Sequence, residues 1–347
     1  MTKDQLYDAY VDMLGEPDER LDTGQGYDIV YALPIEEEGL EEGEIMTMGL
    51  SAVLQEQGCG AVELALYISE PDEEVYREIA DYIASLVSRF IDEKKCFETG
   101  TDIRNVALPG FNSMNCLYLP STQIHAPATL AGVPVIELAP LYEEEVLVLN
   151  VLPPQLQTLV FREAGGDWSD PQREPIALVD EALHNVWNDI SQWYQENAPA
   201  LHAQLEQGAS DRTIKDLEAL LQIALPPDYA ASLTTCNGQV SFHSHKYLSA
   251  EQVMQNWKMM KELDDTGALG HGWWNKHWIP FAKDGGGNFI CIDTEKSALY
   301  PIVYWDKEEG PVKAGFSCFL DWLANYRDAL YQNRFRVNDE GFLEEKY

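Results

Sequence analysis

The feature that most constrains the fold is a stretch near the middle of the chain that has no apolar periodicity. Residues 164–175 read AGGDWSDPQREP and contain two glycines and two prolines. Such segments connect ordered elements and do not continue them. A chain of 347 residues is also too long for one ordinary hydrophobic core. The sequence therefore predicts two domains, residues 1–165 and residues 179–347, joined by a linker at 166–178.

The first half mixes strand and helix patterns. Residues 62–68 alternate between apolar and other side chains, which is typical of a half-buried strand. A helix is expected to begin at Ser69 and to run to about Phe90, with acidic residues in its first turn. Residues 3–14 have apolar side chains at helical spacing. The segment 142–161 fits either a helix or a strand.

The second half begins with helical patterns, and a group of strands follows them. Helices are expected over 179–193, after Ser210 as an N-cap, from Leu225 onward, and over 316–331. Strands are expected at 278–281, 289–293 and 302–305. Both halves therefore predict an α+β fold, in which each domain is a mainly antiparallel sheet with flanking helices.

The net charge of −36 is extreme for a chain of this size. A field of this sign repels phosphate groups of nucleic acids and anionic lipid headgroups, so direct binding to either is not expected. It attracts basic partners and accelerates their encounter. The alternative is that the charge serves solubility alone. No apolar run reaches the length of a membrane span, and the N-terminus lacks the pattern of a signal peptide, so a cytoplasmic location is expected.

The six cysteines are widely scattered, and none belongs to a CxxC motif. Most lie in apolar surroundings, as Cys116 and Cys291 do. We interpret them as buried reduced thiols and expect neither a disulfide framework nor a zinc site.

The motifs that resemble catalytic or ligand sites have simpler structural explanations. The loop from Asp284 to Asn288 is rich in glycine but lacks the Lys-Ser/Thr of a phosphate-binding loop, so a hairpin turn is favoured. Four histidines, at positions 243, 245, 271 and 277, lack the further ligands of a tetrahedral metal set. No Gly-x-Ser-x-Gly elbow occurs. We therefore predict that the protein is not an enzyme and uses neither a cofactor nor a metal.

Two surface regions are candidates for binding a partner. One is the acidic run whose glutamates are Glu36, Glu37, Glu38, Glu41, Glu42 and Glu44; it is either a solvated loop or a landing site for basic side chains. The other is in the second half and contains Trp273, Trp274, Asn275, Asp284 and Asn288. Two adjacent tryptophans on an extended segment point to opposite sides, so one is expected at the surface, where tryptophan is typical of binding hot spots. The alternative is that both belong to the core.

The second half, from about residue 180 to 340, resembles the yeast cell-wall-assembly-regulator type of the SUKH superfamily. The resemblance rests on the order and spacing of eight short runs: Trp187–Ile190 with Trp193, Gly208–Ser210, Leu225–Tyr229, Asn237–Gln239, Trp278–Ala282, Asp284–Asn288, Ile292–Asp293 and Phe316–Leu320.

The first half resembles suppressor-of-fused-like domains. Glu63–Ile68 is similar to the central strand of that family, and Val135–Glu145 looks like its late strand and acidic turn. At Thr99–Asn105, where the family has a Gly-His pair, this chain has Gly100-Thr101-Asp102. Bacterial members of both families are often immunity proteins that bind and neutralise toxins, commonly nucleases or deaminases. The resemblance therefore implies a non-catalytic protein that binds a basic toxin, with a monomer favoured. The alternative is a regulatory scaffold that binds several host proteins.

Overall fold

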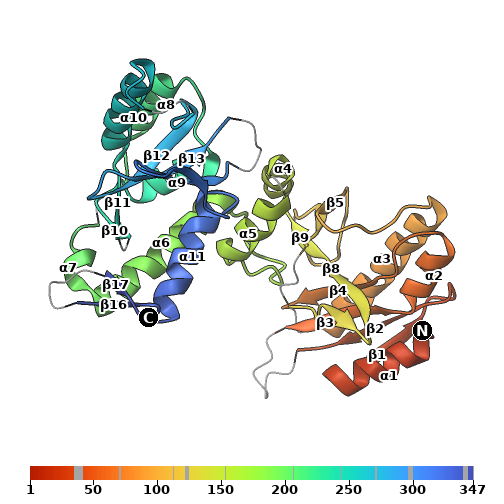
Figure 1. The fold of residues 1–347 in the computed structure, drawn as a ribbon. Helices are drawn as coiled ribbons and strands as arrows, with labels where there is room; N and C mark the ends of the chain where they lie inside the picture. The colour runs from red at the N-terminus through yellow and green to blue at the C-terminus, as the bar shows by residue number, and fades with distance from the viewer. Residues whose placement is uncertain are drawn as a thin grey trace. The chain divides into compact units, whose positions relative to one another are not determined.

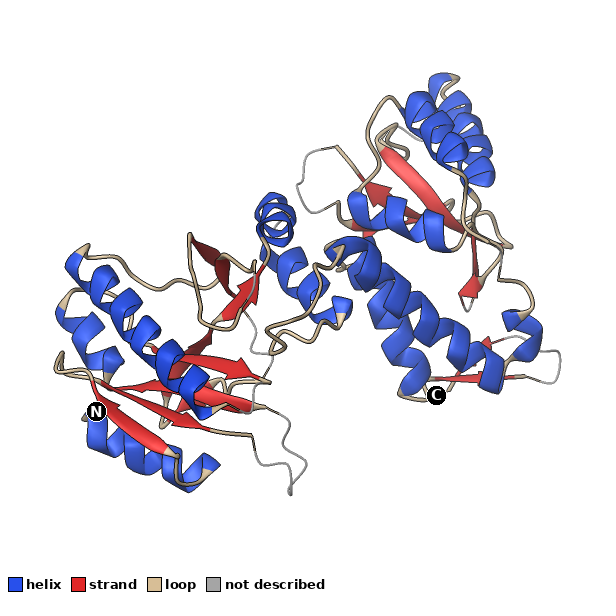
Figure 2. Cartoon of the chain, turned by 180° about the vertical axis from the view of Figure 1, so that it is seen from behind, coloured by secondary structure: helices blue, strands red, loops and turns tan. Residues whose placement is uncertain are grey.

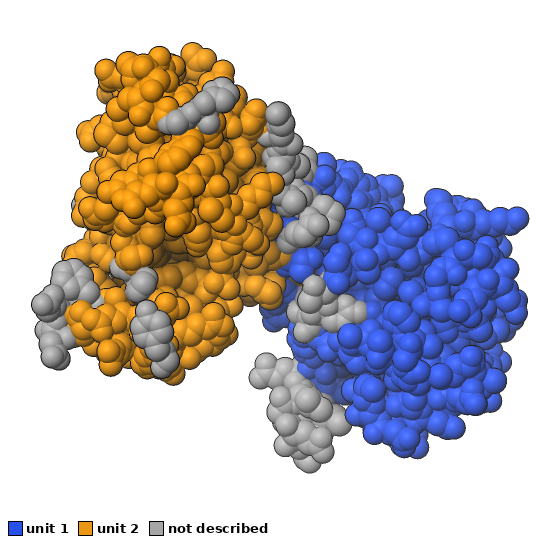
Figure 3. Space-filling model, in the orientation of Figure 1, with its two compact units in different colours: residues 1–158, 166–176 blue, residues 159–165, 177–347 orange. Residues whose placement is uncertain are grey.

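The computed structural model shows two compact units, which Figure 3 distinguishes by colour. Unit 1 comprises residues 1–158 and 166–176, and unit 2 comprises residues 159–165 and 177–347. The described residues are 1–34, 42–69, 72–111, 113–121, 125–152, 154–205, 207–242, 244–269, 272–295, 300–338 and 343–346.

The elements of unit 1 are drawn from red to yellow-green in Figure 1. In chain order they are α1 (Lys3–Leu14), β1 (Glu19–Asp22), β2 (Asp28–Ala32), β3 (Gly43–Met48), α2 (Leu50–Glu56), β4 (Glu63–Ile68), α3 (Glu73–Asp92), β5 (Thr101–Arg104), β6 (Cys116–Leu119), β7 (Thr129–Leu130), β8 (Val133–Glu137), β9 (Ala139–Leu141) and α4 (Glu143–Val151). Helix α5 (Pro154–Ala164) begins in unit 1 and ends in unit 2.

The elements of unit 2 follow α5. They are α6 (Leu178–Asn197), α7 (Pro199–His202), α8 (Asp211–Leu221), α9 (Pro227–Thr235), β10 (Ser241–Phe242), β11 (His245–Tyr247), α10 (Ala250–Asp265), β12 (Trp278–Asp284), β13 (Phe289–Asp293), β14 (Ile302–Asp306), β15 (Gly310–Lys313), α11 (Phe319–Tyr331), β16 (Phe335–Val337) and β17 (Leu343–Glu345). The helix and strand content of each unit is seen again from behind in Figure 2.

Unit 1 is built on a six-stranded sheet of order β1-β2-β3-β4-β8-β7, in which only the β4–β8 pairing is parallel. Its central strands β2, β3 and β4 are buried on both faces. Ile45 and Leu66 point towards α2 and α3, and Met46 and Ala65 point towards α1. Figure 1 shows α1 on one side of this sheet and α3 on the other. A smaller sheet, β5-β6-β9, completes the unit.

The expected helix start at Ser69 is wrong. Helix α3 is capped by Asp72, whose carboxylate accepts the amide of Glu74 at 2.9 Å. Ser69 instead pairs with Ser169: its amide donates to the Ser169 carbonyl at 2.9 Å, and the two hydroxyls lie 2.6 Å apart. Serine and aspartate are about equally good N-caps, so the engagement of Ser69 by Ser169 leaves Asp72 to cap the helix.

The segment 166–176 packs within unit 1 around one ion pair. The two terminal guanidinium nitrogens of Arg173, Nη1 and Nη2, donate to the two Glu145 carboxylate oxygens at 2.7 Å each, and both side chains are almost fully buried. The Arg173 guanidinium also lies over the ring of Trp168, 4.9 Å from its centroid. Buried pairs with this bidentate geometry fix the conformation of the chain segments that carry them.

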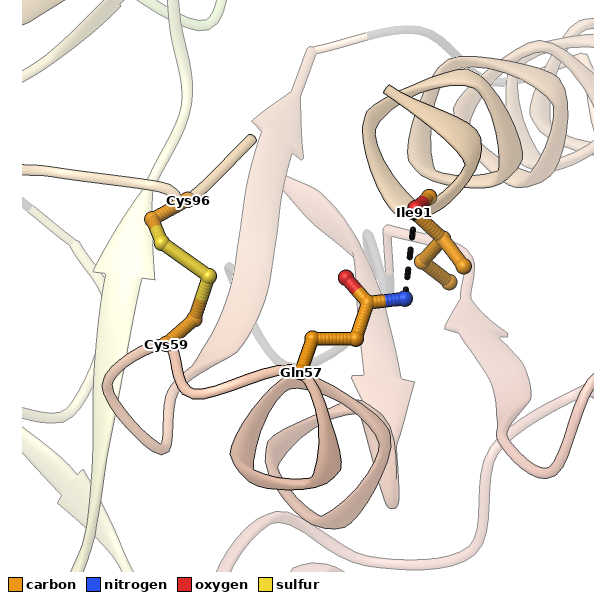
Figure 4. The surroundings of a disulfide bond; sticks show 4 residues. All are labelled: Gln57, Cys59, Ile91 and Cys96. Carbon is orange, nitrogen blue, oxygen red and sulfur yellow. Dashed lines mark hydrogen bonds between the residues drawn. A yellow bond between two sulfur atoms is a disulfide. The ribbon is translucent and has the colours of Figure 1, made fainter. Parts of the chain in front are cut away.

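The expectation that all cysteines are reduced thiols is wrong for one pair. Cys59, after α2, and Cys96, after α3, form a disulfide with Cα atoms 5.5 Å apart (Figure 4). Beside it, the Gln57 side-chain amide donates to the Ile91 carbonyl at 3.2 Å. The two cysteines are 37 positions apart, and only the packing of the two helices brings them together. The other four cysteines are free and buried, as expected.

Unit 2 is built on the antiparallel sheet β10-β11-β12-β13-β14-β15. Figure 1 shows α8 and α10 on one side of β12 and β13, and α6, α9 and α11 on the other. The α10 side holds Trp257, Trp274 and Trp278. Both units thus have mainly antiparallel sheets with flanking helices, which confirms the predicted α+β class.

Two motifs of unit 2 have clear structural roles. Gly208 lies against α9, and a Cβ at this position would be 1.6 Å from the Thr234 carbonyl oxygen, so only glycine fits. Asp228, at the start of α9, is buried and accepts the amides of Tyr229 and Leu320 at 2.9 Å. It therefore ties the start of α9 to the first turn of α11.

Candidate functional site

A cleft of about 410 Å³ lies in unit 2, between α11, the β10–β11 hairpin and strands β13 and β14. Most of its lining is aromatic or aliphatic, and a few polar side chains are grouped on it. Clefts of this kind are the usual form of binding sites in proteins. Its lining residues are Phe242, Ser244, His245, Asp284, Asn288, Phe289, Ile290, Tyr304, Trp305, Asp306, Phe316, Trp322, Asn325, Tyr326, Ala329 and Phe335.

One wall of the cleft is an aromatic cluster on α11. Trp322 and Tyr326 are one turn apart, with nearly parallel rings whose centroids are 6.4 Å apart. Phe242 of β10 meets both edge-on, at 4.9 and 4.8 Å. The Tyr326 hydroxyl is 2.7 Å from that of Tyr194 on α6. These contacts fix the rings, so the wall is preorganised.

The polar end of the cleft is the turn between β12 and β13. The Asp284 carboxylate accepts two hydrogen bonds from Asn288, one from its backbone amide at 2.7 Å and one from its side-chain NH₂ at 2.9 Å. The Asn288 side-chain oxygen accepts the Lys307 amide at 3.0 Å. Burial alone would raise the pKa of Asp284, but the hydrogen bonds from Asn288, the neighbouring His245 and the Gly287 amide together hold it below its ordinary value. The Asp284 side chain is therefore an anion at neutral pH.

A second carboxylate and an exposed tyrosine lie on β14. One oxygen of Asp306 accepts the amides of Glu308 and Glu309, at 2.7 and 3.0 Å. Tyr304 is 39% exposed and is directly opposite Val312, which is 56% exposed, so the two form an apolar patch beside the cleft. Because β15 is an edge strand that contains a proline and a lysine, this edge is protected against pairing with another strand.

Of the sequence-predicted site residues in unit 2, Asp284 and Asn288 line the cleft. The others lie outside its lining. Trp274 is 4% exposed and belongs to the core below α10, whereas Trp273 is half-buried and its carbonyl accepts the Trp305 indole N–H at 2.5 Å. The Asn275 side chain donates to a Glu295 oxygen at 2.6 Å.

Glu42 and Glu44 lie in unit 1, and Glu42 lies next to His125. The two nitrogens of His125 face Glu42 at 3.3 Å and Glu137 at 3.0 Å. Burial disfavours the charged imidazole, but Glu137 and Glu42 outweigh it and raise the pKa of His125. Glu44 is buried against the Tyr10 hydroxyl, and burial raises its pKa. Glu42 and Glu44 are therefore each held by contacts within unit 1, Glu42 with His125 and Glu44 with Tyr10.

The remaining acidic candidates, Glu36, Glu37, Glu38 and Glu41, lie outside the described residues. So do His243 and His271, while His245 is 3.0 Å from the Ser244 hydroxyl. Within the described ranges, no group of His, Cys, Asp and Glu side chains has the arrangement of a metal site. No helix in these ranges has the length and apolar character to cross a membrane.

The sequence reasoning missed the aromatic wall. Trp322 and Tyr326 have the i, i+4 spacing of one helix face, within a segment expected to be helical. That spacing alone is equally typical of core residues. The lining of the cleft by this helix face depends on its packing against β10 and β14, which no local pattern reveals.

Comparison with known proteins finds a matching family model for the second half and similar solved structures for the N-terminal part. Residues 208–325 match the model of the SMI1/KNR4 family, SUKH-1, which confirms the resemblance predicted for the second half. A glucan synthesis regulatory protein of Neurospora crassa is 31% identical over 85 residues, which are 22% of this chain and 16% of that protein. The chain thus spans only a small part of this relative.

Suppressor-of-fused proteins are among the similar solved structures for the N-terminal part. A homologue from Neisseria gonorrhoeae has a TM-score of 0.39 and 16% identity, over 50% of this chain and 95% of that one. A chain of the Sufu–Fu complex has a TM-score of 0.37 and 14% identity, over 53% of this chain and 94% of that one. The Drosophila protein has a TM-score of 0.36 and 14% identity, over 55% and 54%.

Proposed function

We propose that this chain is a non-catalytic protein-binding protein that neutralises a basic toxin by binding to it. The observation that carries the proposal is the cleft of unit 2, whose lining combines aromatic side chains, among them the exposed Tyr304, with the ionised carboxylate of Asp284. Aromatic side chains held in place at the surface are typical centres of protein interfaces. An inhibitor of this kind needs only tight occupancy and slow release, and no chemistry.

The net charge supports a basic partner. Toxins that act on nucleic acids carry cationic surfaces to bind phosphate groups. A chain with a charge of −36 attracts such a surface over a distance of about a Debye length and competes with the nucleic acid for it. The match of residues 208–325 to the SUKH-1 family supports the same proposal, because bacterial members of the family that the second half resembles are often immunity proteins. A cytoplasmic site of action is part of this proposal.

A second candidate function is a regulatory scaffold. It is favoured by the Neurospora relative, which is described as a regulatory protein of glucan synthesis. A scaffold would bind several partners with moderate affinity, whereas an immunity protein would bind one partner tightly.

Capture of partners on the tagged full-length protein, with washes of rising salt and identification of each eluate, tests the proposal. We expect one dominant basic protein that is released by salt and that kills cells when it is expressed alone. Co-expression of this chain should restore growth. Several unrelated partners, none of them toxic, would favour the scaffold and contradict toxin neutralisation.

A further inference from the structure

We propose that the cleft of unit 2 receives an arginine side chain of the protein partner. The inference rests on the proposed function, because it takes the occupant from a basic protein. Beyond the proposed function, the inference specifies the chemical group that is bound, a guanidinium, and the side chains of this chain that bind it.

The first argument comes from the aromatic surfaces. Tyr304, Trp322 and Tyr326 line one cleft: Tyr304 is 39% exposed, whereas Trp322 and Tyr326 are buried and held in place by neighbouring rings. A cation over the accessible ring of Tyr304 is stabilised by the negative electrostatic potential of its face. Guanidinium is planar and weakly hydrated, so it stacks on aromatic rings more readily than the compact, strongly hydrated ammonium of lysine.

The second argument comes from the carboxylates. Asp284 is ionised, and its hydrogen bonds with Asn288 orient it at the end of the cleft. Asp306 uses one oxygen, Oδ1, for two backbone amides, and no donor within the described parts of the chain contacts its other oxygen. A guanidinium has five N–H donors in a planar fork, which suits two carboxylates on one cleft.

The third argument concerns size and charge. A volume of about 410 Å³ is at the lower end of binding cavities and suits one long side chain better than a folded segment. An anionic occupant would meet Asp284 and Asp306 at the cleft, in a chain whose net charge is −36. The chemistry therefore selects a cation with an apolar stem, and arginine is the side chain that combines both.

The test uses the full-length protein and two small probes, N-acetyl-arginine methylamide and its neutral citrulline counterpart. NMR titration should show saturable shifts at the amides of residues around Asn288 and Tyr304 with the arginine probe. The citrulline probe has nearly the same shape without the charge and should bind roughly tenfold more weakly.

Two variants assign the binding to the cleft. Tyr304→Ala and Asp306→Asn should each weaken arginine binding about fivefold, because they remove a ring face and a charge. Tyr331→Ala is the matched control: Tyr331 is 49% exposed on α11 and does not line the cleft, so this variant should bind as the unchanged protein does. Far-UV circular dichroism of each variant verifies the fold.

The outcomes separate this inference from the proposed function. Equal binding of both probes, or no saturable shift with the arginine probe, would overturn the arginine assignment. If a captured toxin bound Tyr304→Ala and Asp306→Asn as tightly as the unchanged protein, the inference would fail while toxin neutralisation stood. Conversely, if the cleft bound the arginine probe selectively but the capture experiment found no toxic partner, the inference would stand and the proposed function would fail.

Discussion

Removal of the Cys59–Cys96 disulfide should destabilise unit 1 by a calculable amount. The bond closes a loop of 37 residues. In the chain-entropy model, a cross-link of this span removes about 13 cal/mol/K from the unfolded ensemble, which is about 4 kcal/mol at 25 °C. For a unit of this size, a loss of that magnitude lowers the melting temperature by roughly 10 °C. We therefore expect the double variant Cys59→Ser, Cys96→Ser to melt about 10 °C lower in unit 1.

The distribution of tryptophans makes this measurement selective. Of the nine tryptophans, Trp168 lies in unit 1 and the others lie in unit 2. Tryptophan fluorescence thus follows mainly unit 2, whereas circular dichroism follows both units. In the variant, the circular-dichroism transition of unit 1 should move to lower temperature. The tryptophan-fluorescence transition, which follows mainly unit 2, should stay where it is. Dithiothreitol should shift the unchanged protein in the same way and leave the variant unaffected.

Thiol counting provides the decisive control. Under denaturing, non-reducing conditions, the protein should show four reactive thiols, because the other cysteines are free. Six thiols, or a variant whose unit 1 is destabilised by less than about 1 kcal/mol, would refute the reasoning. Alkylation directly in the cells of origin would also test the location, since disulfides persist in oxidising compartments and are rare in the cytosol.

Three further changes test other parts of the structure. Gly208→Ala should destabilise unit 2 by about 3 kcal/mol or more in urea unfolding, because its Cβ would collide with the Thr234 carbonyl; a loss below about 1 kcal/mol would contradict this close approach. Asp228→Ala should cost about 2 kcal/mol by leaving two helix amides without their acceptor, which hydrogen exchange at the start of α11 would detect. Glu137 raises the pKa of His125 in the folded protein. The stabilisation of the folded state by this pair is therefore complete below the pKa of 6.5 that His125 has in the unfolded chain, and it is lost as the pH rises through the pKa of His125 in the folded protein. The stability difference from His125→Gln should therefore be larger near about pH 6 than near about pH 9, and a difference independent of pH would contradict the ion pair.

The fold class followed from the sequence because its signals are local. The strand at Glu63–Ile68 and the helix capped by Ser210 were both predicted from periodicity and capping residues, and both are present. The start of α3 was misplaced by three positions because Ser69 and Asp72 are both good caps, and only tertiary contacts with Ser169 decide between them. The disulfide was missed because cysteine spacing carries no information about two helices that pack side by side.

The cleft shows how far the same reasoning reaches towards function. Asp284 and Asn288 were identified because a glycine-rich turn is a local motif, and the structure places both on the cleft. The aromatic partners come from β14 and α11, and no spacing in the sequence connects them with that turn. Conversely, the net charge was evident from the composition, yet Glu44 is buried beside Tyr10 and is unavailable to a partner. Long-range charge can bring a basic protein near this chain, but selection among basic proteins requires short-range complementarity. Under the proposed function, the side chains of unit 2 that would provide this complementarity are ones which only the folded structure brings together.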